Sequence, residues 1–168
     1  MNNQVVESVE VFNYLGALFT NKVDDTNEVR RRIAMAKKAM VTLTNIWKDR
    51  FIYQRTKKRI LQALVFPIAT YGAECWVLKQ VDELKIVAFE LWCYRRLLRV
   101  SWVDRRTNEW VLEGIGRCPR LLDSINDRKL RFLGHVARTK GQTKELLFGT
   151  NPWEKKTRKT QNKDGRQC

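Results

Sequence analysis

Two adjacent carboxylates are the first residues of this sequence that could do chemistry. Asp24 and Asp25 form its only Asp-Asp pair, and neighbouring carboxylates can hold the two metal ions of a phosphoryl-transfer site. The pair stands directly before an amphipathic segment at 26–48, with Glu28 three residues after Asp25. This arrangement is typical of a capping box, so we expect Asp25 to cap a helix and not to bind metal.

A third carboxylate, Glu74, lies in the stretch FPIATYGAECW at 66–76. No nucleophile, second acid or set of metal ligands accompanies it in the sequence, so a general-base role has no support. We expect Glu74 to form an ion pair with Arg95 or Arg96. If that pair is partly buried, the loss of one partner would be costly.

The single histidine and the four cysteines offer no clear catalytic or metal-binding pattern. Cys75, Cys93, Cys118 and Cys168 are widely spaced, without the Cys-x-x-Cys pairs of zinc sites. We expect free thiols, three of them in or near the core. His135 could complete a Cys/His set in space, but a packed or phosphate-facing imidazole is the stronger expectation. The sequence thus predicts no catalytic residue, no metal and no cofactor.

Positive charge is the dominant feature of the composition. The chain of 168 residues contains 33 Lys and Arg against 18 Asp and Glu, a formal net charge of +15. Such a surplus indicates a polyanionic partner, and it does not indicate a small-molecule substrate. The hydrophobic content of 43% is that of a chain that folds.

The elements that must position these residues are mainly helical. Alternating β-branched and aromatic residues around Gly16 predict a short hairpin. After it, apolar residues at spacings of three and four predict a helix over 26–48, with the stripe Val29, Ile33, Ala36, Met40, Leu43 and Trp47. Its basic residues Arg30, Arg31, Arg32, Lys37 and Lys38 fall largely on the solvent side.

Further helices follow the same pattern. A second helix enters through Lys57-Lys58-Arg59, is kinked by Pro67 and ends near Gly72. A third covers about 83–99 with Asp82 as its cap, a short one covers 108–115 between Thr107 and Gly116, and a last one covers about 120–138. The sequence therefore predicts a mainly α fold: a short N-terminal β-hairpin, a bundle of about five helices and a disordered basic C-terminal tail.

Several stretches, taken in order, resemble one family. They are VFNYLGALFT, NEVRRRIAMAKKAM, FPIATYGAECW, YRRLLRVSWVDRRTNEWVL and LRFLGHVAR. Together they resemble the C-terminal part of the reverse transcriptase encoded by non-LTR (LINE-type) retrotransposons. The resemblance implies a primer-grip hairpin at 1–22, a thumb-like bundle at 23–100, a C-terminal helical region at 101–150 and the tail at 151–168.

The resemblance also implies a function. In this family the hairpin and thumb hold a template–primer duplex, and Tyr14-Leu15-Gly16 looks like the primer grip itself. The Tyr/Phe-x-Asp-Asp motif that binds the catalytic metals, and the endonuclease domain, would precede Tyr14, so we expect the chain not to polymerise DNA alone. We also expect contact between the hairpin and a palm domain outside this chain.

The residue pattern and the resemblance together predict a nucleic-acid-binding set. Basic clusters near helix starts can meet phosphates without reading sequence, and Trp102, in a basic loop, is the best candidate to stack on a base. The predicted set is Tyr14, Leu15, Gly16, Arg30, Arg31, Arg32, Lys37, Lys38, Lys57, Lys58, Arg59 and Trp102.

An alternative remains open, in which the chain is a transposon remnant that serves as a helical protein-interaction module. An exposed apolar hairpin face (Val11, Leu15, Leu18 or Phe19) would favour the first hypothesis, because a rebuilt domain would have covered it. No apolar run approaches the roughly 20 residues of a membrane span. We expect an intracellular protein, nuclear or cytoplasmic, without membrane contact.

Overall fold

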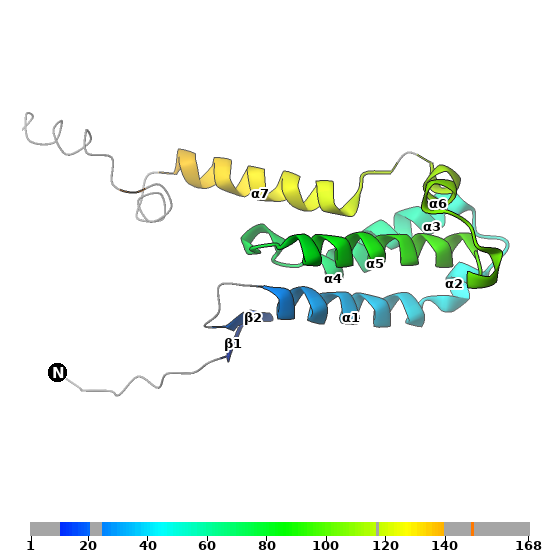
Figure 1. Ribbon diagram of the computed structural model, residues 1–168, viewed down its shortest axis with the longest axis horizontal. Helices are drawn as coiled ribbons and strands as arrows, with labels where there is room; N and C mark the ends of the chain where they lie inside the picture. Colours follow the sequence, from blue (N-terminus) through cyan, green and yellow to red (C-terminus); the bar gives the residue numbers. More distant parts are fainter. Residues whose placement is uncertain (1–10, 21–24, 117, 140–148, 150–168) are drawn as a thin grey trace, which may run out of the picture. The chain divides into compact units, whose positions relative to one another are not determined.

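The computed structural model describes residues 11–20, 25–116, 118–139 and 149. Within these, a two-stranded hairpin precedes a series of helices (Figure 1), which confirms the predicted mainly α fold. The chain divides into two compact units, 1–128 and 129–168. The hairpin and the hydrophobic core both belong to the first unit. The predicted disordered tail at 151–168 lies outside the described residues.

The hairpin forms where alternation and a glycine predicted it. Strands β1 (Val11–Tyr14) and β2 (Ala17–Thr20) pair antiparallel, with Tyr14 opposite Ala17. The turn consists of Leu15 and Gly16, which have φ values of 47° and 78°. Two successive positive φ values suit the right-handed twist of a two-residue hairpin, and glycine adopts one of them without strain.

The first long amphipathic segment forms two helices, not the single helix predicted over 26–48. α1 spans Thr26–Thr42 and α2 spans Thr44–Lys48, with Leu43 between them. At the break, side chains take carbonyl groups that a continuous helix would use: the Trp47 indole donates to Met40 O at 2.8 Å. The predicted apolar stripe is nevertheless confirmed, because Val29, Ala36, Met40 and Trp47 are buried and Ile33 and Leu43 pack against them.

The predicted capping box of α1 is wrong. Asp25 makes no side-chain cap hydrogen bond; its carboxylate accepts from the backbone N–H of Val77 at 2.6 Å. Glu28 is buried and pairs with arginines of its own helix instead. Asp25 therefore joins the start of α1 to a distant turn, a contact that local spacing cannot predict.

The segment around Pro67 contains a wider, π-helical turn. α3 (Gln54–Ile60) passes into a π-helical turn, η1 (Leu61–Val65), and then α4 (Phe66–Ala69). A π turn before the proline is one recognised cause of a kink, and proline itself removes a backbone donor. Gly72, at φ 71°, ends the segment as predicted and leads into the 3₁₀ turn η2 (Ala73–Cys75).

The remaining helices follow the predicted order. α5 spans Gln80–Leu98, so Asp82 lies inside its first turn and is not its cap. After the 3₁₀ turn η3 (Trp102–Asp104), α6 covers Asn108–Ile115 as predicted, with the Thr107 hydroxyl accepting from Trp110 N and Gly116 ending the helix at φ 70°. α7 covers Leu121–Arg138 and crosses the boundary between the two units.

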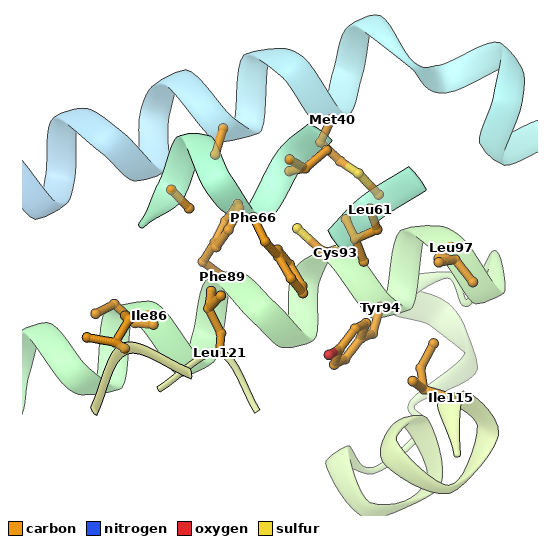
Figure 2. Packing of buried hydrophobic residues seen from close by; sticks show 14 of the residues in the cluster. Met40, Leu61, Phe66, Ile86, Phe89, Cys93, Tyr94, Leu97, Ile115 and Leu121 are labelled. Carbon is orange, nitrogen blue, oxygen red and sulfur yellow. The ribbon is translucent and has the colours of Figure 1, made fainter. Parts of the chain in front are cut away.

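The core of the first unit lies where α1, η1, α4 and α5 meet. Met40, Leu61, Phe66 and Phe89 converge there (Figure 2), and the rings of Phe66 and Tyr94 meet edge to face at 6.1 Å. Trp47 and Trp76 are also buried. Burial of side chains this large is the main stabilising term available to the bundle.

The cysteines lie only partly where the sequence predicted. Cys93 is buried, and burial raises the pKa of its thiol. Cys118 packs against the core, whereas Cys75 is exposed, and Cys168 lies outside the described residues. The thiols of Cys75, Cys93 and Cys118 are free, as predicted.

Candidate nucleic-acid interface

Helices α1 and α5 lie side by side (Figure 1) and carry cations along their shared border. Arg30 and Lys37 from α1 and Lys85 from α5 line a cavity of about 460 Å³. Both α1 residues are exposed, whereas Lys85 pairs with the buried carboxylate of Asp82 at 2.8 Å. Trp92 lines the same cavity.

A denser cluster of arginines lies at the C-terminal end of α5. Arg95, Arg96 and Arg99 line a cavity of about 340 Å³, together with Lys48 of α2 and two hydroxyl-bearing residues, Thr44 and Ser101. Cations at this end of a helix are favoured by the helix dipole, which offsets part of their mutual repulsion.

A third cavity, of about 790 Å³, joins these regions to the loop after α5. It is lined by Trp92, Arg95, Arg96, Val100, Arg105 and Arg106. It shares Trp92 with the first cavity and Arg95 and Arg96 with the second, so the three hollows adjoin one another along α5. We call this surface the basic groove, and its cations are Arg30, Lys37, Lys48, Lys85, Arg95, Arg96, Arg99, Arg105 and Arg106.

The basic groove has a one-sided charge distribution. No Asp or Glu is among the described residues that line its three cavities. Three of its arginines also donate hydrogen bonds within the protein. Arg95 Nη2 donates to Arg106 O and Asn108 Oδ1 at 2.9 Å, Arg96 Nη2 donates to Thr44 Oγ1 at 3.4 Å, and Arg99 Nε donates to Trp47 O at 3.2 Å. The remaining guanidinium hydrogens can donate to an anionic ligand, because each guanidinium carries five donors.

The predicted site residues on α1 divide into two groups. Arg30 and Lys37 line the basic groove, and Lys38 is exposed. Arg32 is buried, and Arg31 is partly buried, so the prediction that this cluster lies on the solvent side is wrong for Arg32.

Arg31 and Arg32 are held by Glu28. Nε of each lies 2.7 Å from a Glu28 carboxylate oxygen, and each also donates to the carbonyl of Gly16. Burial alone would raise the pKa of Glu28, but these two hydrogen-bonded arginines outweigh it, and the pKa lies below its ordinary value. Arg31 and Arg32 therefore connect the hairpin turn to α1.

In the second predicted cluster, Lys57-Lys58-Arg59, both lysines donate hydrogen bonds to backbone carbonyl groups of the protein. Lys57 is buried, and its Nζ donates to Trp47 O at 2.9 Å and to Asp49 O at 2.6 Å. Burial lowers the pKa of Lys57. Lys58 donates to the carbonyl of Ile115, whereas Arg59 is exposed.

The predicted primer-grip residues lie at the tip of the hairpin. Tyr14, Leu15 and Gly16 are exposed, and Leu15 O accepts from the Tyr71 hydroxyl at 3.0 Å. The Arg32 guanidinium lies 4.3 Å from the centre of the Tyr71 ring. Trp102 lies in η3 next to the basic groove, but its side chain is outside what the structure describes.

Glu74 forms an ion pair, as predicted, but with a different partner. Its carboxylate lies 3.4 Å from Arg128, not from Arg95 or Arg96. Arg128 also donates to Thr70 O at 3.0 Å, so it links the start of α7 to the turn after α4. Arg95 and Arg96 instead face the basic groove.

Among the described residues, no group of three or more His, Cys, Asp or Glu side chains could hold a metal ion. His135 is exposed near the end of α7, in the second unit. Asp24 lies outside the described residues, and Asp25 binds Val77 N.

Sequence reasoning missed most of the basic groove. Lys48, Trp92, Arg95, Arg96, Arg99, Arg105 and Arg106 were not in the predicted set. A signal was present, since three arginines end α5 and two more follow within the next loop. Their meeting with Lys48 depends on the break between α1 and α2, which no local pattern indicated.

The chain is similar to a protein of Caenorhabditis elegans whose name describes it as transposon-derived. The two are 26% identical over 152 residues, which cover 88% of this chain and 54% of that protein. The chain thus spans about half the length of the relative it matches, and its sequence is transposon-related. No family model and no solved structure matches the chain. Within the described residues, no helix is long and apolar enough to cross a bilayer.

Proposed function

We propose that this chain is a nucleic-acid-binding part of a non-LTR retrotransposon reverse transcriptase, and that it acts without a catalytic step of its own. The basic groove carries the proposal. A row of adjoining hollows lined by cations from α1, α2, α5 and the loop after α5 is suited to a chain of phosphates.

The physical basis of binding would be phosphate contact and counterion release. Arginine guanidinium groups match phosphate oxygens with two parallel hydrogen bonds, and Arg96, Arg105 and Arg106 line the largest of the three cavities. Contacts of this kind give affinity and position without reading base sequence. The proposed role is therefore to hold a template or primer strand, and base pairing elsewhere would select the sequence.

The hairpin gives a second line of support for the reverse transcriptase assignment. Its turn, Tyr14-Leu15-Gly16, resembles the primer grip, and Arg31 and Arg32 fix it to α1 through the Gly16 carbonyl. Val11 and Leu15 expose 56% and 75% of their surface. Exposed apolar residues on the first strand and turn of the hairpin favour contact with another domain, for which a palm domain is our candidate.

A protein-interaction module is the second candidate function. The exposed hairpin counts against it, because a domain rebuilt for such a role would have covered this apolar surface. The two candidates differ in the basic groove, which an interaction through the hairpin would not use. Binding of nucleic acid therefore separates them.

The test is a titration of the protein with a fluorescently labelled RNA–DNA hybrid at several salt concentrations. We expect affinity to fall steeply with salt, by roughly 0.9 in log–log slope for each phosphate contacted. The variant Arg96→Gln/Arg105→Gln should reduce that slope by about two. Absent or salt-independent binding of both this hybrid and a single strand would contradict the proposal.

A matched control removes two exposed cations that line none of the groove's three cavities, Arg55 and Arg59, again by substitution with glutamine. Both variants lower the net charge equally, so a general charge effect would change the two slopes alike. We expect the control to retain nearly the wild-type slope. Far-ultraviolet circular dichroism of all three proteins checks that the helices are intact.

A further inference from the structure

Trp92 lies at the centre of the basic groove. It lines both the cavity of about 460 Å³ between α1 and α5 and the cavity of about 790 Å³ beside the arginine cluster. Its side chain is half-buried. An aromatic ring inside a cationic groove offers a face to a base, which a purely basic groove does not.

The ring of Trp92 is supported from the core. Phe89, which is buried and visible in Figure 2, stacks near it with ring centres 6.3 Å apart and planes inclined by 24°. A ring that is already held in place loses little conformational freedom when a ligand binds. The remaining exposed part of Trp92 is therefore a rigid platform.

Two cations lie close to this platform. Lys37 Nζ is 5.8 Å and Arg96 Cζ is 5.5 Å from the centre of the Trp92 ring. Both side chains are long, and both line the groove, so they can contact the phosphates next to a stacked base. The cation–π contacts hold them near the ring until such a ligand arrives.

The length of the groove suits several nucleotides. From Lys85 to Arg99, α5 rises by about 21 Å at 1.5 Å per residue. Within a duplex, however, each base is stacked between its neighbours and presents only its edges in the grooves. The face of Trp92 can therefore be used by an unpaired base and not by a paired one.

We propose that the basic groove holds an unpaired strand of RNA or DNA, with one base stacked on Trp92 and the adjacent phosphates on Lys37 and Arg96. This inference rests on the proposed function and narrows it, because it selects a single strand as the ligand of the groove. Among the other tryptophans whose side chains the structure describes, Trp47 and Trp76 are buried, and Trp110 does not line the groove.

The test compares two strands of equal charge. One is a labelled oligothymidylate about 12 nucleotides long, within the usual range of single-strand site sizes. The other is an abasic strand of the same length, which retains the phosphates and lacks the bases. We expect the wild-type protein to bind the abasic strand about 5- to 150-fold more weakly, the range for loss of one stacked base.

A set of variants assigns the effect to Trp92. Trp92→Leu keeps an apolar side chain over Phe89 but removes the platform, so we expect it to bind oligothymidylate about as weakly as the wild type binds the abasic strand. Trp92→Phe, which retains an aromatic ring, should bind oligothymidylate more tightly than Trp92→Leu but more weakly than the wild type. Trp110→Leu, which removes a partly exposed tryptophan outside the groove, should leave both affinities unchanged.

Equal, salt-dependent binding of the two strands by the wild-type protein would overturn this inference and leave the proposed function standing. The inference is also overturned if Trp92→Leu weakens the binding of both strands by the same factor. If neither strand nor the hybrid binds in a salt-dependent manner, the proposed function itself fails.

Discussion

The carboxylate of Glu90 accepts a hydrogen bond from the backbone N–H of Leu121 at 2.8 Å, although 31 residues separate them. Glu90 is fully buried in α5, and Leu121 is the first residue of α7. Arg120 Nε lies 3.1 Å from the same carboxylate, and the Tyr94 hydroxyl donates to it at 3.1 Å. The buried carboxylate of Glu90, in α5, thus provides a hydrogen-bond acceptor for a backbone N–H at the start of α7.

We expect Glu90→Ala to be among the most destabilising single substitutions in the first unit. It leaves a buried N–H and a guanidinium without their acceptor, a change that costs about 3–5 kcal/mol for a fully buried pair. Because Arg120 is partly exposed, the lower end of that range is expected. Glu90→Gln should cost less, because its amide oxygen can still accept from Leu121. Urea unfolding checks both, and a loss below about 1 kcal/mol for the alanine variant would contradict the assignment.

Stability should fall in acid because two buried carboxylates are held ionised. Burial alone would raise the pKa of Glu28 and of Asp82, but arginines oppose it at Glu28, and Lys85 and Thr26 oppose it at Asp82, so both pKa values lie below their ordinary 4.5 and 3.8. The unfolded chain then binds more protons than the folded one as pH falls through this range. The stabilisation is present above pH 4.5 and is lost progressively below it.

The measurement is the free energy of unfolding in urea between neutral pH and about pH 3. We expect Glu28→Gln/Asp82→Asn to be less stable than the wild type at neutral pH and to show a shallower loss in acid. If this variant lost stability in acid as steeply as the wild type, the acid sensitivity would have to come from groups other than Glu28 and Asp82.

Removal of the α6 cap should have a small, local effect. The Thr107 hydroxyl accepts from Trp110 N at 3.2 Å, so Thr107→Ala leaves one N–H at the helix start without its side-chain acceptor. We expect a loss of about 1 kcal/mol, measured by thermal or urea unfolding. Thr107→Ser, which retains the hydroxyl, is the matched control and should stay close to the wild type.

Substitution by methionine should lower the free energy of unfolding much more at Lys57 than at Arg59. Lys57→Met removes the donor from two carbonyl groups, those of Trp47 and Asp49, and should cost about 1–3 kcal/mol. Arg59→Met, at an exposed position, should change stability by less than about 0.5 kcal/mol. Equal effects on urea unfolding would argue against a structural role for Lys57.

Local signals predicted local structure well. The turn at Leu15-Gly16, the short helix between Thr107 and Gly116, and the apolar stripe of α1 all follow from neighbouring residues. Two local predictions failed, because the helix over 26–48 is broken at Leu43 and Asp82 lies inside α5. Other failed predictions concern partners at a distance. Asp25 binds Val77 and Glu74 binds Arg128, and periodicity carries no information about such pairs.

The candidate site was predictable only in part for the same reason. Spacing along α1 indicated Arg30 and Lys37, which do line the basic groove. Of the arginines at the end of α5, Arg95 and Arg96 were predicted only as ion-pair partners of Glu74. Whether a cation faces solvent, a carbonyl or a groove depends on packing, as the burial of Arg32 and Lys57 shows.

The π-helical turn at Leu61–Val65 has a consequence for the alignment of related chains. A hydrogen bond from i to i+5 encloses one residue more than an α-helical bond. The loss of one residue at this point would convert the turn to an α-helical one, and the flanking helices could each keep their own apolar face on the core. We therefore expect a one-residue gap between Leu61 and Val65 in alignments with homologues. The helical periodicity of apolar residues should then be assigned separately before and after this gap.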